Sequence, residues 1–406
     1  MKVCVVGLGY IGLPTATLAA SAGNEVIGVD TNQSIVDSIN GAHSHITEAG
    51  LNELVVEVVT KGNLKAQTEV AKADIYLVAV PTPITEPRKK ADLNYVVSAA
   101  KSVAKVISKG CLFIIESTIP PKCTEETIVP LLEESGLKAG EDFFVAHCPE
   151  RVIPGRILYE LENNDRVIGG LNQKSAEMAR EFYATFVKGE IFTTGLTEAE
   201  LTKLSENAYR DVNIAYANEL ALICETLGVD PWDVIRLANR HPRVNILTPG
   251  PGVGGHCIAV DPWFLVEKCP QETRLIAAAR DVNDDRPERI AAAISARLTA
   301  LNIDKPTVAC LGLTYKANVA DMRESPAVAV VSSLMRRGFV VKMCDPYANS
   351  ESSYKLMSVD DAVTGADALV LLVDHDEYKA LDPRELAKKM RNQVILDTRG
   401  VWKLQA

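Results

Sequence analysis

The sequence predicts an α/β protein in which two doubly wound lobes are joined by a helical central domain with a long helix. Near the N-terminus, an apolar run, a glycine-rich turn, a helical pattern and a second apolar run form the βαβ opening of a parallel sheet. In the middle, residues 197–227 contain neither Pro nor Gly and carry apolar residues at helical intervals. After residue 306, short apolar runs alternate with helical stretches once more. A chain of 406 residues is also too long for one ordinary core, so two or three domains are expected.

The first lobe is placed at residues 1–192. It begins with a strand at residues 3–6, a helix that ends near residue 22, and a strand at residues 25–30. Apolar runs at residues 75–80 and 112–115 are typical of buried parallel strands. Polar residues follow each run, among them Thr82 and Thr118, at the edge where ligands of such sheets bind.

The central domain is placed at residues 193–300, with the long helix followed by helices from residue 231 and from about residue 271 to 300. On the long helix, Lys203, Asn207 and Arg210 are spaced i, i+4 and i+7, so they project from one face. Asp211 and Asn218 add to an unusually polar helix. From spacing alone, a functional face and a solvated surface face are equally good interpretations.

The last lobe is placed at residues 301–406, with strands predicted at residues 308–311, 340–344, 368–373 and 394–396. The stretch of residues 312–316 follows a strand but lacks the third glycine of a dinucleotide-binding turn. This lobe is therefore expected to bind something other than NAD. Lys316 and Arg323 supply positive charge suited to a nucleotide diphosphate, although a plain surface pair explains them nearly as well.

Composition restricts the partners and the location of the protein. The formal net charge of −10 opposes nucleic acid or an anionic membrane as a general partner. The nine cysteines show no CxxC pair or metal-like Cys/His spacing, so we expect reduced thiols in a cytoplasmic protein and no metal site. The first apolar run breaks at Gly7 without a cleavage site, and no run approaches a membrane span of 18 residues, so neither a signal peptide nor a membrane helix is expected.

The N-terminal turn has the spacing of a dinucleotide-binding site. It follows a strand and opens a helix, which directs backbone N–H groups and the positive helix end toward a pyrophosphate. Asp30 ends the second strand and supplies the carboxylate expected to bind ribose hydroxyls. Because residues 31–33 contain no arginine for a 2′-phosphate, NAD is favoured over NADP. The predicted turn residues are Gly7, Gly9, Tyr10, Ile11 and Gly12.

A glycine-dense loop leads into Cys257. Glycines let the backbone come close to a ligand, and a thiolate held there can add to a carbonyl carbon, a step that simple alcohol oxidation does not need. The alternative is a small buried hydrophobe, which is the common role of cysteine. His256 could serve only to shape the loop, and Asp261 could be a general base or a capping residue before a proline. Upstream, His241 and Arg243 belong to a polar stretch suited to phosphate binding or to a surface loop.

Together these motifs resemble the UDP-glucose/GDP-mannose dehydrogenase family over nearly the whole chain. The most specific stretches are residues 148–155 (CPERVIPG), 164–170 (NDRVIGG), 207–215 (NAYRDVNIA) and 240–247 (RHPRVNIL). The resemblance implies oxidation of the C6 alcohol of a UDP-sugar to a carboxylate, with two NAD reduced in succession. Cys257 would capture the aldehyde, Lys203 would act as acid/base beside Asn207, and Asp261 would help to activate water.

The resemblance also assigns binding residues and a partner. Tyr10, Ile11, Asp30, Thr82, Thr118 and Arg323 would contact NAD. In family members the residue at Arg243 reaches a neighbouring subunit's site and the central helices form a dimer, so a homodimer or higher oligomer is implied. The residues that would line the UDP-sugar site are Arg151, Val152, Lys203, Asn207, Arg210, His241, Arg243, Gly254, Tyr315, Lys316 and Arg399.

Two departures from the UDP-glucose branch indicate the sugar. This chain has the glycine-rich loop and His256 before the cysteine, as enzymes of N-acetylated sugars do, and Arg151 follows Glu150 where the glucose branch has an apolar residue. With the polar stretch at residues 241–245, these features favour UDP-N-acetylmannosamine. UDP-N-acetylglucosamine and UDP-glucose stay open as substrates, as does a sensor that binds NAD and nucleotide sugars without turnover. A one-step hydroxyacid dehydrogenase needs no C-terminal lobe, and the last hundred residues count against it.

Overall fold

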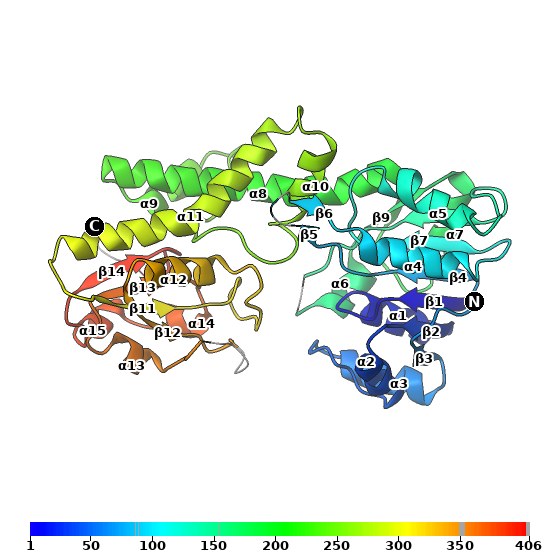
Figure 1. Cartoon of the computed structure of the whole chain (residues 1–406), viewed down its shortest axis with the longest axis horizontal. Helices are drawn as coiled ribbons and strands as arrows, with labels where there is room; N and C mark the ends of the chain where they lie inside the picture. Colours follow the sequence, from blue (N-terminus) through cyan, green and yellow to red (C-terminus); the bar gives the residue numbers. More distant parts are fainter. Residues whose placement is uncertain (86, 88, 154, 349–353, 403–406) are drawn as a thin grey trace. The chain divides into compact units, whose positions relative to one another are not determined.

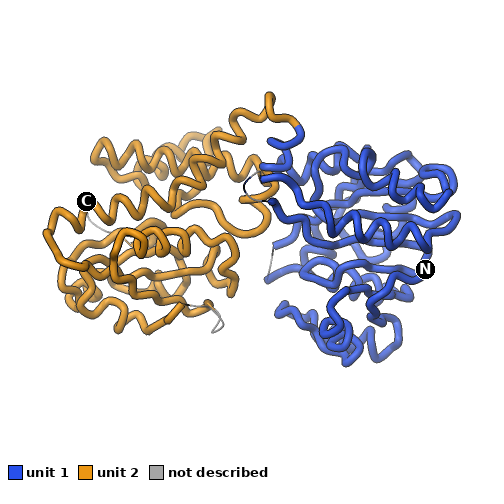
Figure 2. Tube along the Cα trace, in the orientation of Figure 1, with its two compact units in different colours: residues 1–206, 263–268 blue, residues 207–262, 269–406 orange. Residues whose placement is uncertain are grey.

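The computed structural model describes residues 1–85, 87, 89–153, 155–348 and 354–402. Pro154 of the 148–155 motif, and residues 349–353 and 403–406 of the predicted last lobe, lie outside the described residues. The chain forms two compact units (Figure 2). Unit 1 consists of Met1–Glu206 and Trp263–Lys268, and unit 2 of Asn207–Pro262 and Cys269–Ala406. The helices α8 (Leu196–Leu227) and α10 (Asp261–Lys268) contribute residues to both units.

Unit 1 is built on a sheet with the strand order β10-β9-β8-β7-β4-β1-β2-β3 (Figure 1). The β8–β9 pair is antiparallel, and the other neighbouring strands are parallel. The order reverses direction around β1 and β4, and ligands of such sheets bind at this point, outside the carboxyl ends of the strands. The strands are β1 (Lys2–Val6), β2 (Glu25–Val29), β3 (Leu64–Gln67), β4 (Ile75–Val78), β7 (Leu112–Ile115), β8 (Phe144–His147), β9 (Arg166–Gly170) and β10 (Ile191–Gly195), with a separate hairpin of β5 (Ile84–Thr85) and β6 (Lys90–Ala91).

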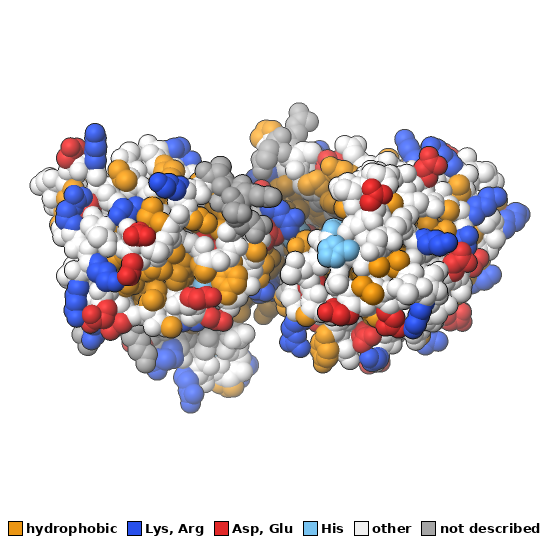
Figure 3. All heavy atoms as spheres, turned by 90° about the horizontal axis from the view of Figure 1, so that it is seen from below, with side chains coloured by type: hydrophobic (Ala, Val, Ile, Leu, Met, Phe, Trp, Pro, Cys, Tyr) orange, Lys and Arg blue, Asp and Glu red, His pale blue; other side chains and the backbone are white. Residues whose placement is uncertain are grey.

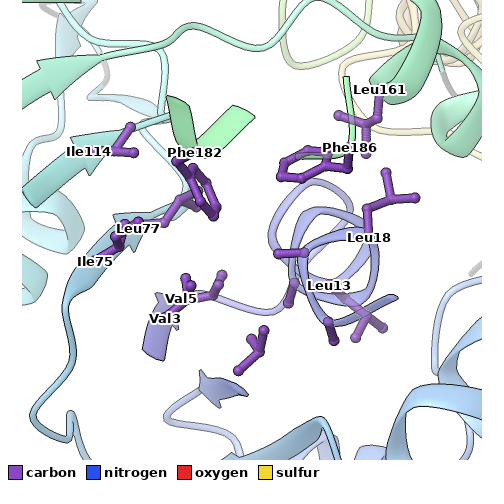
Figure 4. Close-up of a cluster of buried hydrophobic side chains, with 14 of the residues drawn as sticks. Val3, Val5, Leu13, Leu18, Ile75, Leu77, Ile114, Leu161, Phe182 and Phe186 are labelled. Carbon is purple, nitrogen blue, oxygen red and sulfur yellow. The ribbon is translucent and has the colours of Figure 1, made fainter. Parts of the chain in front are cut away.

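Helices cover both faces of this sheet, as the doubly wound prediction requires. Val3 and Val5 of β1 point into one core, and Cys4 and Val6 into the other, because side chains alternate along a strand. Figure 4 shows the first core, where Val3 and Val5 lie near Leu13 of α1. The helices on that face are α1 (Gly12–Ser21), α2 (Gln33–Asn40), α3 (Leu51–Thr60), α6 (Ile157–Asn163) and α7 (Gln173–Tyr183), and those on the other are α4 (Asn94–Ala104), the π-helical turn η1 (Thr124–Ile128) and α5 (Val129–Glu133).

Unit 2 carries the second sheet, with the strand order β12-β11-β13-β14 and parallel pairing throughout. Val308 and Cys310 face one core with α11 and α12, whereas Ala309 and Leu311 face another with α13, α14 and α15. The expected second doubly wound lobe is thereby confirmed. The elements are α9 (Pro231–Ala238), α11 (Arg274–Thr299), β11 (Thr307–Leu311), α12 (Pro326–Arg336), β12 (Val340–Cys344), α13 (Val359–Val363), β13 (Ala368–Leu371), α14 (Asp376–Lys379), α15 (Pro383–Ala387) and β14 (Val394–Asp397).

Charged side chains of both signs lie on the surface of the protein. On the face seen in Figure 3, Lys and Arg side chains are interspersed with Asp and Glu side chains. Among the described residues, no helix is both long and apolar enough to span a bilayer, and no group of His, Cys, Asp and Glu is arranged to hold a metal ion.

A buried polar network joins α8 to α11 in unit 2. Arg280 donates from Nη1 to Asp211 Oδ1 at 2.6 Å, and Asn283 Nδ2 donates to the same oxygen at 2.9 Å. Arg280 is 1% exposed and Asp211 is fully buried. Burial raises the pKa of Asp211, although the neighbouring Arg280 acts in the opposite direction. The polar residues on the long helix therefore include groups that hold its partner helix, rather than only surface or ligand-binding groups.

Removing one member of this ion pair is expected to be costly. Arg280→Ala would leave the Asp211 carboxylate buried without its cation, at a cost of about 3–5 kcal/mol in the free energy of unfolding. Replacing both charges, with Arg280→Met and Asp211→Asn, would recover most of that loss because no buried charge remains. Calorimetric unfolding of the single and the double variant, beside the wild-type protein, measures this. A loss below about 1 kcal/mol for Arg280→Ala would contradict a buried charge pair between α8 and α11.

Candidate functional site

The glycines of the N-terminal turn have three different surroundings. Gly7 has φ +91°, and a Cβ there would lie 2.5 Å from Ala79 O, on the loop after the neighbouring strand β4. A Cβ on Gly12 would lie 1.8 Å from Gly7 O, so α1 can pack onto the turn only without a side chain. At Gly9, by contrast, no atom lies within 4 Å of such a Cβ. This is the pattern of a dinucleotide turn, in which the middle glycine leaves room for a pyrophosphate.

Asp30 is held against the same turn. Its Oδ2 accepts from Leu8 N at 3.0 Å, and its Oδ1 accepts from Asn32 N at 2.9 Å. The carboxylate is half-buried directly after β2, where a ribose of a dinucleotide would lie. Tyr10 is exposed and Ile11 is half-buried at the start of α1. The residues present therefore fit NAD.

Thr82 and Thr118 come together at the carboxyl edge of the sheet. They follow the neighbouring strands β4 and β7, and Thr82 Oγ1 donates to Thr118 O at 2.5 Å. Both are half-buried. Among the residues predicted to contact NAD, Arg323 lies in unit 2, where its guanidinium pairs with Asp321 at 2.6 Å.

Unit 1 contains a cluster of buried polar side chains that was not predicted from the sequence. Arg166 Nη1 lies 3.1 Å from Glu150 Oε2 and 3.8 Å from Glu116 Oε1. Tyr183 donates from its hydroxyl to Glu116 Oε1 at 2.7 Å. Burial raises the pKa of Glu116 to about 7, against the effect of Arg166. A signal for Glu116 was present, because it follows the predicted strand at residues 112–115, but nothing local indicated its partner 50 residues away.

This cluster supports the segment that carries Arg151 and Val152. Glu150 Oε1 accepts from Arg151 N at 2.6 Å, while its other oxygen binds Arg166. Arg151 reaches Glu206 Oε1 from Nη1 at 2.7 Å and donates from Nη2 to Asp165 O. Val152 packs against the core on the α1 face. Glu150 and Arg166 thus fix the backbone at the start of the residues predicted to contact a sugar.

In unit 2, two of the predicted catalytic residues are in direct contact. Asn207 Nδ2 donates to Asp261 Oδ2 at 2.5 Å. Asn207 lies on α8, one turn after the half-buried Lys203 and one turn before the exposed Arg210. Asp261 is 3% exposed and begins α10. The polar face of α8 and the end of the cysteine loop are therefore linked.

Cys257 is exposed, whereas Cys4 and Cys310 are buried in β1 and β11. The carbonyl oxygen of Cys257 accepts from Asp261 N at 2.8 Å and from Val260 N at 3.0 Å, which places the thiol at the turn leading into α10. Because the thiol is exposed, the alternative interpretation of Cys257 as a small buried hydrophobe does not apply. His256 beside it is also exposed.

The glycines before Cys257 let the loop pack closely on another segment of unit 2. A Cβ on Gly254 would lie 2.4 Å from Glu324 O, and a Cβ on Gly255 would lie 2.9 Å from Tyr315 Cε2. Gly255 also has φ +82°, a conformation that residues with a side chain rarely adopt. The loop that carries the cysteine therefore touches the loop that carries Tyr315 and Lys316.

The start of the cysteine loop is held by Asn218 and lies close to Arg399. Gly250 N donates to Asn218 Oδ1 at 2.8 Å, and Asn218 Nδ2 donates to Asn283 Oδ1 at 2.9 Å. Arg399 Nε donates to Asp374 Oδ1 at 2.9 Å, and a Cβ on Gly250 would lie 2.4 Å from Arg399 Nη1. The remaining predicted residues, His241 and Arg243, lie exposed on the stretch after α9, and Lys316 is exposed after β11.

The chain matches one family model in three consecutive parts. The UDP-glucose/GDP-mannose dehydrogenase family's NAD binding domain matches residues 1–187, its central domain residues 197–285, and its UDP binding domain residues 309–404. The chain belongs to the UDP-glucose/GDP-mannose dehydrogenase family. It is thus an NAD-dependent dehydrogenase whose last domain is of the UDP-binding type.

Individual relatives resemble the chain along almost its whole length. A Methanocaldococcus jannaschii protein named UDP-N-acetyl-D-mannosamine dehydrogenase is 50% identical, over 98% of this chain and 92% of the relative. A Ralstonia solanacearum protein named NDP-N-acetyl-D-galactosaminuronic acid dehydrogenase is 46% identical, over 98% and 96%. The structure of a UDP-D-ManNAc dehydrogenase from Pyrococcus horikoshii has a TM-score of 0.93 at 42% identity and covers 100% of this chain and 97% of the other.

The different surroundings of Gly9 and Gly12 give a direct test of the NAD site. Gly9→Ala is expected to weaken NAD binding at least about tenfold, because the methyl group takes space needed by the pyrophosphate, while thermal stability changes little. Gly12→Ala is expected to destabilise unit 1 by about 1–3 kcal/mol or more through overpacking. Isothermal titration with NAD and calorimetric unfolding separate the two effects. Unchanged NAD affinity in a folded Gly9→Ala protein would refute the assignment.

Proposed function

We propose that this protein oxidises UDP-N-acetyl-D-mannosamine at C6 to UDP-N-acetyl-D-mannosaminuronate, with reduction of two NAD⁺ to two NADH. The observation that carries the proposal is the exposed Cys257 on the turn that leads directly to Asp261, which is bonded to Asn207. A single alcohol oxidation needs no nucleophile, whereas oxidation of an aldehyde through a covalent adduct does. The names of relatives 46–50% identical to this chain support the N-acetylmannosamine sugar.

Other substrates are distinguishable alternatives. The relative named for N-acetylgalactosaminuronic acid is 46% identical, so an N-acetylated hexosamine is the feature that these relatives share. UDP-N-acetylglucosamine and UDP-glucose are the runner-up substrates for the same reaction. A sensor that binds NAD and nucleotide sugars without turnover is the alternative from another class.

In the first oxidation, the acting side chains on α8 are Lys203 and Asn207. When bound, NAD⁺ supplies the hydride acceptor for each of the two oxidations. Lys203 takes the proton of the C6 hydroxyl as the carbon loses hydride, which yields an aldehyde. The Cys257 thiolate then adds to the aldehyde carbon, and the resulting oxyanion of the thiohemiacetal is held by Lys203 and Asn207.

The second oxidation converts this adduct to a thioester, which water must hydrolyse. Asp261 takes a proton from the water as its oxygen attacks the thioester carbonyl. The C–S bond then breaks, the Cys257 thiolate leaves, and the product is a carboxylate. Asn207 orients the Asp261 carboxylate through the bond from Nδ2 to Oδ2. A covalently held aldehyde cannot diffuse away between the two steps.

Binding of the two ligands is divided along the chain. We assign NAD binding to residues 1–192, helical assembly to residues 193–300 and UDP-sugar binding to residues 301–406. The NAD contacts in this proposal are Gly7, Gly9, Tyr10, Ile11, Gly12, Asp30, Thr82, Thr118 and Arg323. The sugar nucleotide contacts are Arg151, Val152, Lys203, Asn207, Arg210, His241, Arg243, Gly254, Tyr315, Lys316 and Arg399.

The stoichiometry of NADH tests the reaction and its substrate. With limiting UDP-N-acetylmannosamine and excess NAD⁺, two NADH per sugar are expected, against little turnover of UDP-N-acetylglucosamine or UDP-glucose run in parallel. One NADH per sugar would overturn the thioester route. Two NADH with a different sugar would correct the substrate and keep the route, and no NADH with any sugar would favour the sensor.

Cys257→Ser tests the covalent step itself. A serine hydroxyl is a much weaker nucleophile, so we expect stalling at the adduct stage or loss of turnover, by at least about a hundredfold. Cys269→Ser is the matched control, because Cys269 is also exposed but lies after α10. Full activity of Cys257→Ser would refute the role of the thiol.

An apolar stripe on α8 supports a homodimer. Tyr209, Tyr216, Ile223 and Leu227 are 71%, 55%, 50% and 70% exposed, and they recur after seven, seven and four residues. This spacing places them on one side of the helix, where water contact with large apolar groups is unfavourable. We propose that a second copy of the chain covers this stripe in the cytoplasm, and that Arg243 reaches the neighbouring subunit's site.

A charge placed in the middle of the stripe is expected to give monomers. Tyr216→Glu would bury a carboxylate in an apolar interface, so light scattering coupled to size exclusion should show about half the wild-type mass. Tyr95→Glu is the control, because Tyr95 is 53% exposed but lies on α4 of unit 1. An unchanged mass for Tyr216→Glu would exclude this stripe as the interface.

A further inference from the structure

The two sheets carry the same turn after their first strands. Gly7 follows β1 with φ +91°, and Gly312 follows β11 with φ +96°. Gly7 N donates to Val29 O at 2.8 Å, and Gly312 N donates to Cys344 O at 2.8 Å. Both acceptors are the last residue of the second strand in their lobe. The C-terminal lobe therefore repeats the first part of the NAD-type turn.

The repeat extends to the carboxylate after the second strand. Asp30 Oδ2 accepts from Leu8 N, and Oδ1 accepts from the amide two residues after Asp30. In the same way, Asp345 Oδ2 accepts from Leu313 N at 2.6 Å, and Oδ1 accepts from Tyr347 N at 2.8 Å. Asp345 thus occupies the position in its lobe that Asp30 occupies in the first.

The two carboxylates differ in the number of further hydrogen bonds that they accept. Asp345 Oδ2 also binds Thr314 N at 3.0 Å and His375 Nε2 at 3.2 Å, and Oδ1 also accepts from Ala348 N at 2.9 Å. The ring of Tyr347 stacks on His375 with centroids 4.9 Å apart. Burial acts against the charge, but the hydrogen bonds from His375 and the backbone lower the pKa of Asp345 to about 2. A carboxylate that already accepts five donors is closed to a ribose.

The position of the open glycine is also filled. Where Gly9 follows Leu8, Thr314 follows Leu313 and is 1% exposed. Thr314 Oγ1 donates to Lys316 O at 3.0 Å. A pyrophosphate therefore cannot approach this turn as it would approach Gly9, which gives a structural reason for the expectation that the last lobe binds something other than NAD.

His375 connects the carboxylate to the far end of the same loop. Its Nδ1 accepts from Asn318 N at 3.0 Å, so the other ring nitrogen carries the proton toward Asp345. Asp345 and His375 are both buried, and together they hold the amides of Leu313, Thr314 and Asn318. Between these fixed points the loop presents the half-buried Tyr315 and the exposed Lys316.

We propose that Asp345 and His375 are positioning residues for the UDP-sugar, because they fix the loop that presents Tyr315 and Lys316. This inference rests on the proposed function, which assigns those two residues to the sugar nucleotide. A lysine and a tyrosine on a loop held at both ends lose little conformational freedom when the ligand binds, so the pair improves affinity without touching the ligand.

Asp345→Asn tests the proposal. The amide group would place a donor against the backbone donors of Leu313 and Thr314, so the loop must move. We expect the Kd for UDP, measured by isothermal titration, to rise about tenfold, which corresponds to ~1.4 kcal/mol, while the Kd for NAD stays within about twofold. In turnover, the KM for the UDP-sugar should rise by a similar factor, with a much smaller change in kcat.

Asp367→Asn is the matched control. Asp367 is fully buried and accepts from Thr307 N at 2.8 Å, and Arg391 lowers its pKa to about 2. It precedes β13 and so lies at the amino ends of the strands, whereas Asp345 lies at their carboxyl ends. A general loss of lobe stability would affect both variants alike. If the two variants lose the same thermal stability, only Asp345→Asn should bind UDP more weakly.

A second pair of variants covers the case in which Asp345→Asn does not fold. His375→Ala removes the donor to Asp345 and the acceptor for Asn318 N, and should also weaken UDP about tenfold. His375→Gln can restore one of these hydrogen bonds through its carboxamide and should recover part of the loss.

The wild-type titration with UDP separates this inference from the function on which it depends. If the wild-type protein binds no UDP, both the proposed function and this inference fall. If the wild-type protein binds UDP and the Asp345 or His375 variants bind it as tightly as Asp367→Asn does, the inference alone is overturned. A selective loss of UDP affinity in the Asp345 and His375 variants supports it.

Discussion

The rest of the candidate site depends on one interaction, the hydrogen bond that the amide after a turn glycine donates to a carboxylate at the end of the neighbouring strand. In unit 1 it joins Asp30 to Leu8, and in unit 2 it joins Asp345 to Leu313. In each lobe the bond ties the ends of two parallel strands together and fixes the direction in which the loop leaves the sheet. Because backbone amides near such a turn serve as ligand donors, a change of one side chain after the glycine decides whether the turn admits a pyrophosphate or is sealed. Gly9 leaves the first turn open, and Thr314 with His375 closes the second.

Buried polar residues do much of the positioning in both units. In unit 1, Arg166 joins Glu150 and Glu116, and so fixes the backbone at Arg151. In unit 2, Asp211 and Asn218 on α8 bind residues of α11, and Asn218 also holds the amide of Gly250. Each of these groups loses its hydration in the folded chain, so the network is stable only when its main donors and acceptors meet. The start of the cysteine loop is therefore set by the same contacts that pair the two long helices.

The sequence predicts most of the architecture because its strongest signals are local. The turn at residues 7–12, the apolar runs that became β1, β4, β7 and β11 to β14, and the stretch that became α8 were all recognisable within windows of a few residues. The strands β3, β8, β9 and β10 were not predicted, and β9 begins with the buried Arg166, which no periodicity rule would place in a core. The positioning residues were missed for a related reason. Asp345 lies 32 residues from Leu313 and 30 from His375, so only the folded sheet brings them together.

The close packing of the cysteine loop gives its glycines a role beyond ligand approach. Gly254 and Gly255 allow the loop to lie against Glu324 O and the ring of Tyr315, and Tyr315 belongs to the loop that Asp345 and His375 fix. Cys257 follows two residues later. In the proposed reaction, the thiol must meet a carbon at one end of a ligand whose nucleotide end is held near Tyr315 and Lys316. Misplacement of a reacting group by about 1 Å can lower the rate about a hundredfold. A direct contact between the two loops therefore helps to keep the thiol at a fixed distance from the bound nucleotide. A bulkier residue at position 254 or 255 would therefore disturb covalent chemistry and nucleotide binding together, whereas a change at Gly9 would disturb NAD alone.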